Sequence, residues 1–250
     1  MSKKYISIGL MMTVAVASAS NVQSELPVNI SLAKAKMKTR DLEVKNFNSV
    51  AAGGPLQVIV TLGNTEGIKF EGDEEAISTL VTEVKGGALI IRPKMSWTSW
   101  AHKYKDKKII AYVNAKNISS LTMSGDGSIT VKGTINNNSL TTTLSGSGAI
   151  TAVVNVQDYT AVISGSGKLN VTGEADEVTT TISGSGVLSK KGGLKVGSLS
   201  ATISGSGSAY VHTNGEINAF VSGSGKVYYT GNADVSEKKL LGSGGVKKLD

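Results

Sequence analysis

Residues 140–150 read LTTTLSGSGAI, residues 159–169 read YTAVISGSGKL, and residues 178–188 read VTTTISGSGVL. Each stretch repeats one Ser-Gly-Ser-Gly motif with an apolar residue directly before it and another one just beyond it. The full motif begins at Ser145, Ser164, Ser183, Ser204 and Ser222, and variants begin at Ser124 and Leu241. Because the copies follow one another every 18–21 residues, they define a seven-copy repeat, which is typical of stacked architectures.

The residues around each motif keep the same register in every copy. Apolar residues alternate with Thr, Ser and other polar residues, a period-two pattern that predicts strands with one buried face. Directly before the motif stand Met123, Leu144, Ile163, Ile182, Ile203, Val221 and Leu240. Five residues after its first position stand Ile129, Ile150, Leu169, Leu188, Ala209, Val227 and Val246.

Two architectures fit strands that are joined by glycine turns. One is a β-helix whose coils pair in parallel, and the other is a series of antiparallel hairpins in a sandwich. Equivalent positions keep one residue class through all copies, as the stacking of like on like requires, and this favours the β-helix. We therefore predict an all-β chain, a right-handed parallel β-helix-like solenoid with coils of about 19–21 residues.

The first half of the chain follows a different pattern. Strands are predicted at 57–62, from Ile68, and at 88–91 and 108–113, with the last two forming a pair joined by a long polar loop. Asp73 is a plausible N-cap for a short helix over 73–84, for which an irregular bend is the alternative. We expect a loose leader at 20–43 and a single domain at 44–250, divided into an N-terminal β part, 44–123, and the repeat array, 124–250.

Composition excludes several classes of protein. The chain has 250 residues, of which 30 are glycine and none is cysteine, so disulfides, thiolate metal sites and cysteine nucleophiles are excluded. Twenty-two of the glycines lie in 124–250, without the period of collagen. The net charge is +7, but the basic residues are scattered, which predicts no nucleic-acid partner.

The N-terminus resembles a secretory signal peptide. Lys3 and Lys4 precede an apolar run of about 15 residues, which is shorter than the ~20 that a membrane span needs. The small residues that follow predict cleavage after residue 19, so we expect an exported protein that does not span the membrane once cleaved. Its location would be the periplasm, the cell surface or the exterior.

Catalytic and metal-binding patterns are not found in the sequence. His102 and His212 stand alone, and the repeated serines occupy β turns rather than the strand-to-helix elbow of a hydrolase. Asp126 is the only carboxylate within a turn motif, too few for the oxygen shell of calcium. We therefore expect no catalytic residues, no metal and no cofactor.

One segment, 92–108, combines both tryptophans with six basic residues. Flat aromatic rings and cations together are suited to contact with an acidic glycan, a lipopolysaccharide or a protein. The alternative is a hairpin loop with a tryptophan packed onto the body and solvated lysines outside. The candidate contact residues are Arg92, Lys94, Trp97, Trp100, Lys103 and Tyr104.

The sequence VKNF at 44–47, the strand at 57–62, GALII at 87–91 and the repeated Ser-Gly-Ser-Gly turns resemble the bacterial head GIN domain family. This domain of unknown function is described as a "putative auto-transporter adhesin". The resemblance covers about 44–230. It implies an exported β-helix-like domain, similar in shape to pectin lyases but without their catalytic residues, and a role in cell adhesion. The family provides no catalytic or ligand residues to transfer, and this sequence shows no membrane-barrel segment or heptad stalk.

These observations lead to three functional hypotheses. The first is a non-enzymatic exported protein that acts in adhesion or contacts a surface polysaccharide or a protein partner. The second is a structural envelope protein that self-assembles as a homo-oligomer through its flat β faces. The third is a carbohydrate-active enzyme of the pectin-lyase shape, for which the sequence offers no paired carboxylates within one coil.

Overall fold

The computed structural model describes residues 37–104, 107–190 and 193–250. The predicted signal peptide, 1–19, lies outside the described residues, and so does the predicted leader up to residue 36. The rest of that leader contains strand β1 (Met37–Leu42). Within the described ranges, no helix combines the length and the apolar character needed to cross a membrane.

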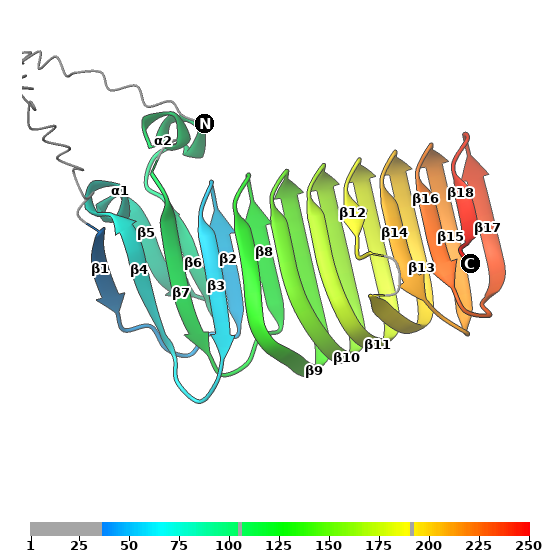
Figure 1. Ribbon diagram of the computed structural model, residues 1–250, viewed down its shortest axis with the longest axis horizontal. Coiled ribbons are helices and arrows are strands. Elements are labelled where there is room, and N and C mark those ends of the chain that lie inside the picture. Colours follow the sequence, from blue (N-terminus) through cyan, green and yellow to red (C-terminus); the bar gives the residue numbers. More distant parts are fainter. Residues whose placement is uncertain (1–36, 105–106, 191–192) are drawn as a thin grey trace, which may run out of the picture. The chain divides into compact units, whose positions relative to one another are not determined.

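Parallel strands stack into a β-solenoid of about 7 turns with coils about 19 residues apart (Figure 1). The long strands bend around the core, so one strand forms most of a coil. The repeat array contains β8 (Ser120–Ser124), β9 (Ser128–Gly146), β10 (Ala149–Gly165), β11 (Lys168–Gly184), β12 (Val187–Leu188), β13 (Leu194–Gly205), β14 (Ser208–His212), β15 (Glu216–Gly223), β16 (Lys226–Thr230), β17 (Asp234–Leu241) and β18 (Gly245–Lys248).

The strand register confirms the parallel solenoid and excludes the antiparallel sandwich for the repeat array. Strand β10 pairs in parallel with β11, and Ile163 lies beside Ile182. Strand β11 pairs in parallel with β13, and Ile182 lies beside Ile203. Equivalent residues of successive copies therefore stack directly on one another, as the repeated sequence pattern predicts.

Columns of aliphatic side chains form the core. The column directly before the turns also extends into the N-terminal region, and each fully buried Ile or Leu contributes about 1.5–3 kcal/mol of transfer free energy. In spatial order it contains Ile91, Ala52, Met123, Leu144, Ile163, Ile182, Ile203, Val221 and Leu240. All but Leu240, which is half-buried, are at most 4% exposed.

The turns stack as closely as the strands do. The backbone N–H of Ser166 donates to the carbonyl of Gly146 at 3.0 Å, and that of Lys168 donates to the carbonyl of Gly148 at 3.0 Å. The second glycine of the motif leaves room for the core, because a Cβ atom on Gly186 would lie 2.3 Å from Cγ2 of Ile163. An apolar side chain of one coil thus fills the space under the turn of the next.

The N-terminal coils do not follow chain order. Strands β2 (Ser49–Gly53) and β3 (Gln57–Leu62) lie between the coil of β6 (Ala88–Pro93) and β7 (Ile109–Ala115) and the coil of β8 and β9. Val50 pairs in register with Leu89 on one side and with Leu121 on the other. In space, the coil of β6 and β7 comes first and the coil of β2 and β3 second, although β2 and β3 come earlier in the sequence.

Antiparallel strands cover the N-terminal end of the solenoid. Strand β4 (Gly67–Asp73) pairs antiparallel with β7 and with β1, and β5 (Leu80–Lys85) pairs antiparallel with β6. Two short helices, α1 (Glu74–Ser78) and α2 (Trp97–Lys103), belong to this end (Figure 1). This antiparallel cap protects the otherwise open edge of the first coil.

Two details of the predicted N-terminal part are wrong. The helix expected over 73–84 ends at Ser78, because the β-branched residues Val81, Thr82 and Val84 continue as β5 along β6. Asp73 is its N-cap, as predicted, and accepts a hydrogen bond from the Ala76 N–H at 3.0 Å. Strands β6 and β7 do not pair with each other, and α2 lies in the loop that joins them.

Candidate functional site

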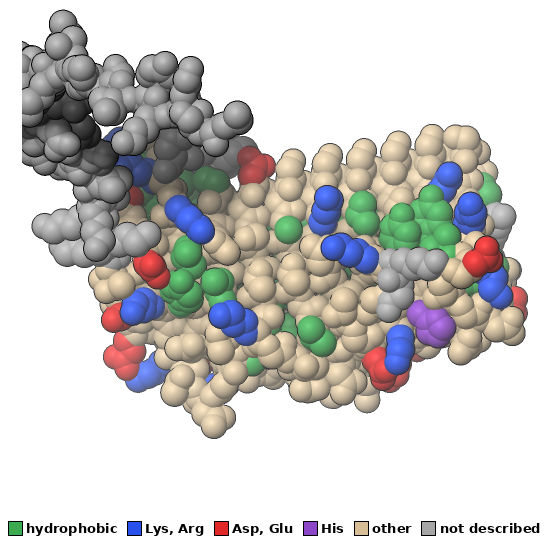
Figure 2. Space-filling model, viewed as in Figure 1, with side chains coloured by type: hydrophobic (Ala, Val, Ile, Leu, Met, Phe, Trp, Pro, Cys, Tyr) green, Lys and Arg blue, Asp and Glu red, His purple; other side chains and the backbone are tan. Residues whose placement is uncertain are grey.

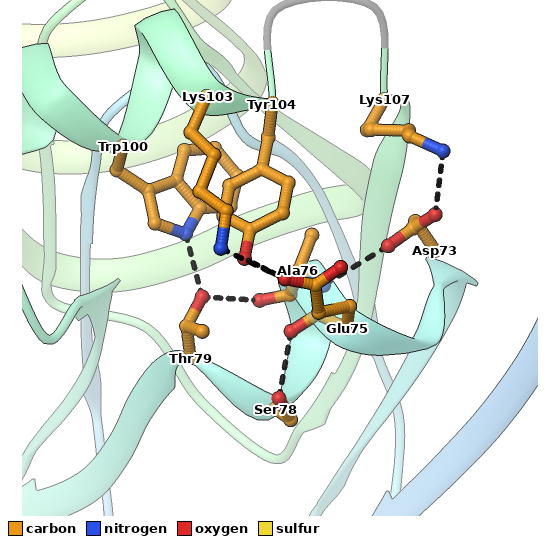
Figure 3. A network of polar contacts seen from close by, with 9 residues as sticks. All are labelled: Asp73, Glu75, Ala76, Ser78, Thr79, Trp100, Lys103, Tyr104 and Lys107. Carbon is orange, nitrogen blue, oxygen red and sulfur yellow. Dashed lines mark hydrogen bonds and ion pairs between the residues drawn. The ribbon is translucent and has the colours of Figure 1, made fainter.

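The aromatic and basic segment around α2 is tied to α1 by polar contacts (Figure 3). Trp100 is 1% exposed, and its Nε1 donates to Oγ1 of Thr79 at 2.7 Å. Tyr104 is 4% exposed, and its hydroxyl donates to Oε1 of Glu75 at 3.1 Å. The two rings pack against each other with centroids 5.1 Å apart, so their faces belong to the interior of the cap.

Charges reinforce this network. The Lys103 ammonium lies 2.8 Å from Oε1 of Glu75 and 4.9 Å from the centroid of the Tyr104 ring. The hydrogen bond with Lys103 holds the pKa of Glu75 below its ordinary value, and the same contact raises the pKa of Lys103. Asp73 pairs with Lys107 at 2.9 Å, and this contact is the main reason that the pKa of Asp73 is lowered.

The six candidate contact residues therefore divide into groups. Trp100, Lys103 and Tyr104 meet in the cap network, where the two rings offer no free stacking face. Arg92 lies on β6 with its Nη2 3.9 Å from Glu83, and Lys94 donates to the carbonyl of Ser78 at 3.3 Å. The side chain of Trp97 lies outside the part that the structure describes.

A larger polar groove lies at the bends opposite the Ser-Gly-Ser-Gly turns. It has a volume of about 690 Å³ and opens to solvent. Amide and hydroxyl side chains from several coils line most of it, and carboxylates lie at one end. The lining residues are Asn48, Asn117, Ser119, Asn136, Asn137, Asn138, Ser139, Asn155, Val156, Gln157, Glu174 and Asp176.

Strand register arranges these side chains in rows along the solenoid axis. Asn136, Asn155 and Glu174 occupy equivalent positions of three successive coils, and the row continues through Lys195 to His212. A second row lies two residues further along each strand, so its side chains point to the same face. It contains Asn138, Gln157 and Asp176.

Part of the groove is fixed by internal hydrogen bonds. The side-chain amides of Asn117 and Asn137 form two reciprocal hydrogen bonds, with Nδ2–Oδ1 distances of 3.0 and 2.8 Å. Asn137 also donates to the carbonyl of Ile118. In contrast, the exposed side chains of Asn138, Asn155 and Gln157 form no hydrogen bond with any described residue. These three amides are therefore available, on a rigid base, to both donors and acceptors of a ligand.

The groove continues toward the C-terminal coils. Glu174 and Asp176 also line a neighbouring hollow of about 360 Å³ together with Lys195 and His212. Glu174 pairs with Lys195 at 3.1 Å, and Nδ1 of His212 lies 2.9 Å from Oγ1 of Thr230. The two hollows share Glu174 and Asp176 and so adjoin along the solenoid axis, and we call the two together the axial groove.

This arrangement is suited to binding. Amides, hydroxyls and carboxylates on a fixed surface are the groups that recognise a hydroxyl-rich ligand by hydrogen bonds. Glu174 and Asp176 are both exposed, whereas the general acid of a glycosidase needs surroundings that favour its protonated form. Within the described ranges, His, Asp and Glu form no cluster of three or more that could hold a metal ion.

Sequence reasoning did not find the groove. Each of its asparagines is an ordinary bend residue, and only the register between coils places Asn136, Asn155 and Glu174 in one row. One signal was present: four asparagines occur within 20 residues, at 136, 137, 138 and 155, in equivalent bends of two copies.

Comparison with known proteins supports the fold. A putative adhesin from Bacteroides fragilis superposes with a TM-score of 0.72 at 20% identity, covering 86% of this chain and 97% of that one. A putative lipid binding protein from Parabacteroides distasonis gives 0.66 at 21% identity, covering 87% of this chain and 98% of that one. A putative adhesin from Parabacteroides merdae gives 0.65 at 19% identity, with coverages of 87% and 98%.

Among proteins with curated descriptions, none matches the chain. The family described as "putative auto-transporter adhesin, head GIN domain" matches residues 46–233, which is most of the chain and includes the groove. Because this match covers well over half of the chain, the chain belongs to the head GIN domain family.

Proposed function

We propose that this chain is an exported, non-enzymatic adhesion domain that holds a polysaccharide along its axial groove. The observation that carries this proposal is the groove of about 690 Å³ with free amides at Asn138, Asn155 and Gln157. Membership of a family described as "putative auto-transporter adhesin" supports an adhesion-like role.

The groove has the direction that an extended polymer needs. Neighbouring strands of a sheet lie about 4.8 Å apart, so the rows along the axis present a new polar side chain at that interval. A polysaccharide laid along the axis would meet equivalent side chains at successive coils. Because the backbone bonds between coils hold the strands in place, the cost of ordering on binding is confined to the side-chain rotamers of the free amides.

The cellular setting follows from the predicted signal peptide and the family. Export would bring the groove to the periplasm, the cell surface or the exterior, where polysaccharides are abundant. The proposal needs no cofactor and no metal, because hydrogen bonding alone supplies recognition. Adhesion would follow from many weak contacts that are repeated along one polymer.

The test compares groove variants in solution. Affinity electrophoresis with polygalacturonate, galactan and dextran should show retention of the chain by at least one of these polymers. Asn155→Ala combined with Gln157→Ala should weaken that retention about tenfold, because two hydrogen bonds contribute about 0.5–1.5 kcal/mol each.

The matched control is Thr179→Ala combined with Ser200→Ala, which removes two exposed polar groups of β11 and β13 outside the groove. This control should bind as the unmodified chain does. Equal binding by the groove variant and the control would place the contact elsewhere and would contradict the proposal.

A further inference from the structure

An aromatic pair lies on the outer face of the C-terminal coils, beside the end of the groove. Tyr210 of β14 and Tyr228 of β16 are neighbours in register. Their rings stack with centroids 4.7 Å apart and an interplanar angle of 13°. Both side chains are partly exposed, and Figure 2 shows a hydrophobic-coloured patch over these strands with lysine or arginine side chains around it.

Lysines surround this pair in the strand register. Lys226 precedes Tyr228 by two residues and so points to the same face, and Lys247 of β18 is the register partner of Tyr228. Lys168 lies in the same row as Lys226, three coils earlier, with Val187 and Ser208 between them. We call Lys168, Lys226, Lys247, Tyr210 and Tyr228 the tyrosine–lysine patch.

The cations of this patch have no carboxylate partners among the described residues. Lys168, Lys226 and Lys247 are exposed, and none of them forms an ion pair with a described residue. Five lysines elsewhere pair with a carboxylate, namely Lys45, Lys103, Lys107, Lys116 and Lys195. Other exposed lysines, such as Lys69 and Lys85, form no ion pair with a described residue either. What distinguishes the patch is that its unpaired ammonium groups lie beside two stacked tyrosines, where they can attract an anionic ligand.

The patch continues from the groove. His212 lines the groove, and it belongs to the same strand and the same outer face as Tyr210. The register partner of His212 in the next coil is Thr230, and Lys226 lies four residues before Thr230 on the same outer face, so the patch flanks the C-terminal end of the groove. A polymer that leaves the groove at His212 toward Tyr210 therefore reaches the lysines. Glu174 and Asp176 lie earlier along this path, and Lys195 offsets the charge of Glu174.

We infer that the tyrosine–lysine patch binds the acidic groups of a polysaccharide whose neutral, hydroxyl-bearing part lies in the groove. This inference rests on the proposed function and names the ligand class, an acidic polysaccharide. Lysine ammonium groups attract its carboxylates, and the tyrosine hydroxyls donate hydrogen bonds to the same oxygens.

A membrane surface fits the patch less well. Binding to a bilayer needs apolar side chains that enter the boundary between headgroups and acyl chains. Among the side chains that the structure describes, the exposed large hydrophobic ones are Val84, Met95, Val153 and Leu241, and none belongs to the patch. A flat sheet face with phenol hydroxyls and ammonium groups instead matches the charged oxygens of a polymer.

The experiment measures binding to polygalacturonate, which is acidic, and to galactan, which is neutral. The unmodified chain should bind polygalacturonate more tightly than galactan, and added salt should reduce this preference. Lys226→Gln combined with Lys247→Gln should weaken binding to polygalacturonate about two- to thirtyfold, the range for two exposed ion pairs, and leave galactan binding unchanged.

The matched control is Lys69→Gln combined with Lys85→Gln, which removes the same charge from exposed positions of β4 and β5. Loss of polygalacturonate binding in the patch variant alone would support the inference. Equal losses in both variants, or no preference for polygalacturonate, would overturn it, even if the groove still binds galactan. Binding to anionic phosphatidylglycerol vesicles but not to polygalacturonate would also overturn it.

Discussion

A Cβ atom on Gly165 would lie 2.6 Å from the carbonyl oxygen of Gly146, the equivalent glycine of the preceding coil. Gly165 also has φ = 120°, a backbone conformation that side chains disfavour. The first glycine of each motif therefore meets two demands at once, a turn conformation and a close approach between coils. These two demands explain why glycine occupies this position in every copy of the motif.

Gly165→Ala is expected to destabilise the chain by about 1–3 kcal/mol, the cost of holding a side chain in such a conformation. The measurement is the free energy of unfolding in urea, followed by circular dichroism. Gly63→Ala is the control, because a Cβ atom at Gly63 meets nothing within 4 Å. Equal stability of the two variants would contradict this account of the turns.

The repeat array was predictable because one local pattern specifies both its strands and its register. Ile163, Ile182 and Ile203 each precede a Ser-Gly-Ser-Gly turn, and stacking the turns places the three side chains in one column. The buried face, the parallel pairing and the coil spacing all followed from that pattern.

The N-terminal coils and the groove were not predictable in the same way. Val50 lies between Leu89 and Leu121, so its partners are far away in the sequence and share no motif with it. The groove depends on the alignment of bends, where Asn136 and Asn155 look like ordinary turn residues until the coils are stacked. Trp100 and Tyr104 suggested a contact surface, but burial against α1 uses their rings in the cap.

Two buried threonines of one core row should respond to substitution in opposite ways. Thr142 and Thr180 both neighbour Ala161 in register. Thr142 Oγ1 lies 2.7 Å from the hydroxyl of Tyr159, whereas Thr180 Oγ1 is buried without a hydrogen-bond partner among the described residues. A buried hydroxyl without a hydrogen bond lowers the free energy of unfolding, whereas a hydrogen-bonded one keeps its partner from being buried unpaired.

Thr180→Val is therefore expected to stabilise the chain by about 1 kcal/mol. Thr142→Val should destabilise it by about 1–3 kcal/mol, because the hydroxyl of Tyr159 would remain buried and unpaired. Urea unfolding of both variants provides the measurement. If Thr142→Val stabilised the chain, or if Thr180→Val destabilised it, the hydrogen bonding of these two hydroxyls would differ from that described above.

The cap should lose stability in acid through Asp73. Its pKa lies below the ordinary value of 3.8, mainly because of Lys107 and then the Ala76 N–H. A carboxylate whose pKa is lower in the folded protein than in the unfolded chain stabilises the fold at pH values above its pKa in the unfolded chain. This contribution is lost as the pH falls through its pKa in the folded protein. The loss of stability therefore begins near pH 3.8 and continues at lower pH.

Asp73→Asn keeps an acceptor for the helix N-cap but removes the ion pair with Lys107. Near neutral pH this variant should be less stable than the unmodified chain by about 0.2–1 kcal/mol, the usual range for a partly exposed pair. The difference should shrink as the pH falls below 3.8, which unfolding curves at several pH values can measure. A difference that stays constant with pH would argue against the ion pair.

The side-chain amides of the groove offer the most direct test of polysaccharide binding. In a ¹H–¹⁵N correlation spectrum, the NH₂ resonances of Asn138, Asn155 and Gln157 can be followed during titration with an oligosaccharide. The oligosaccharide is a fragment of polygalacturonate, galactan or dextran, whichever polymer binds the chain. Asn64 and Asn114, which are exposed outside the groove, serve as internal references.

Binding along the axial groove predicts saturable shifts of the Asn138, Asn155 and Gln157 amides, with Asn64 and Asn114 unchanged. Saturable binding that leaves the three groove amides unshifted would contradict the proposed site and with it the central claim that the groove holds the polysaccharide.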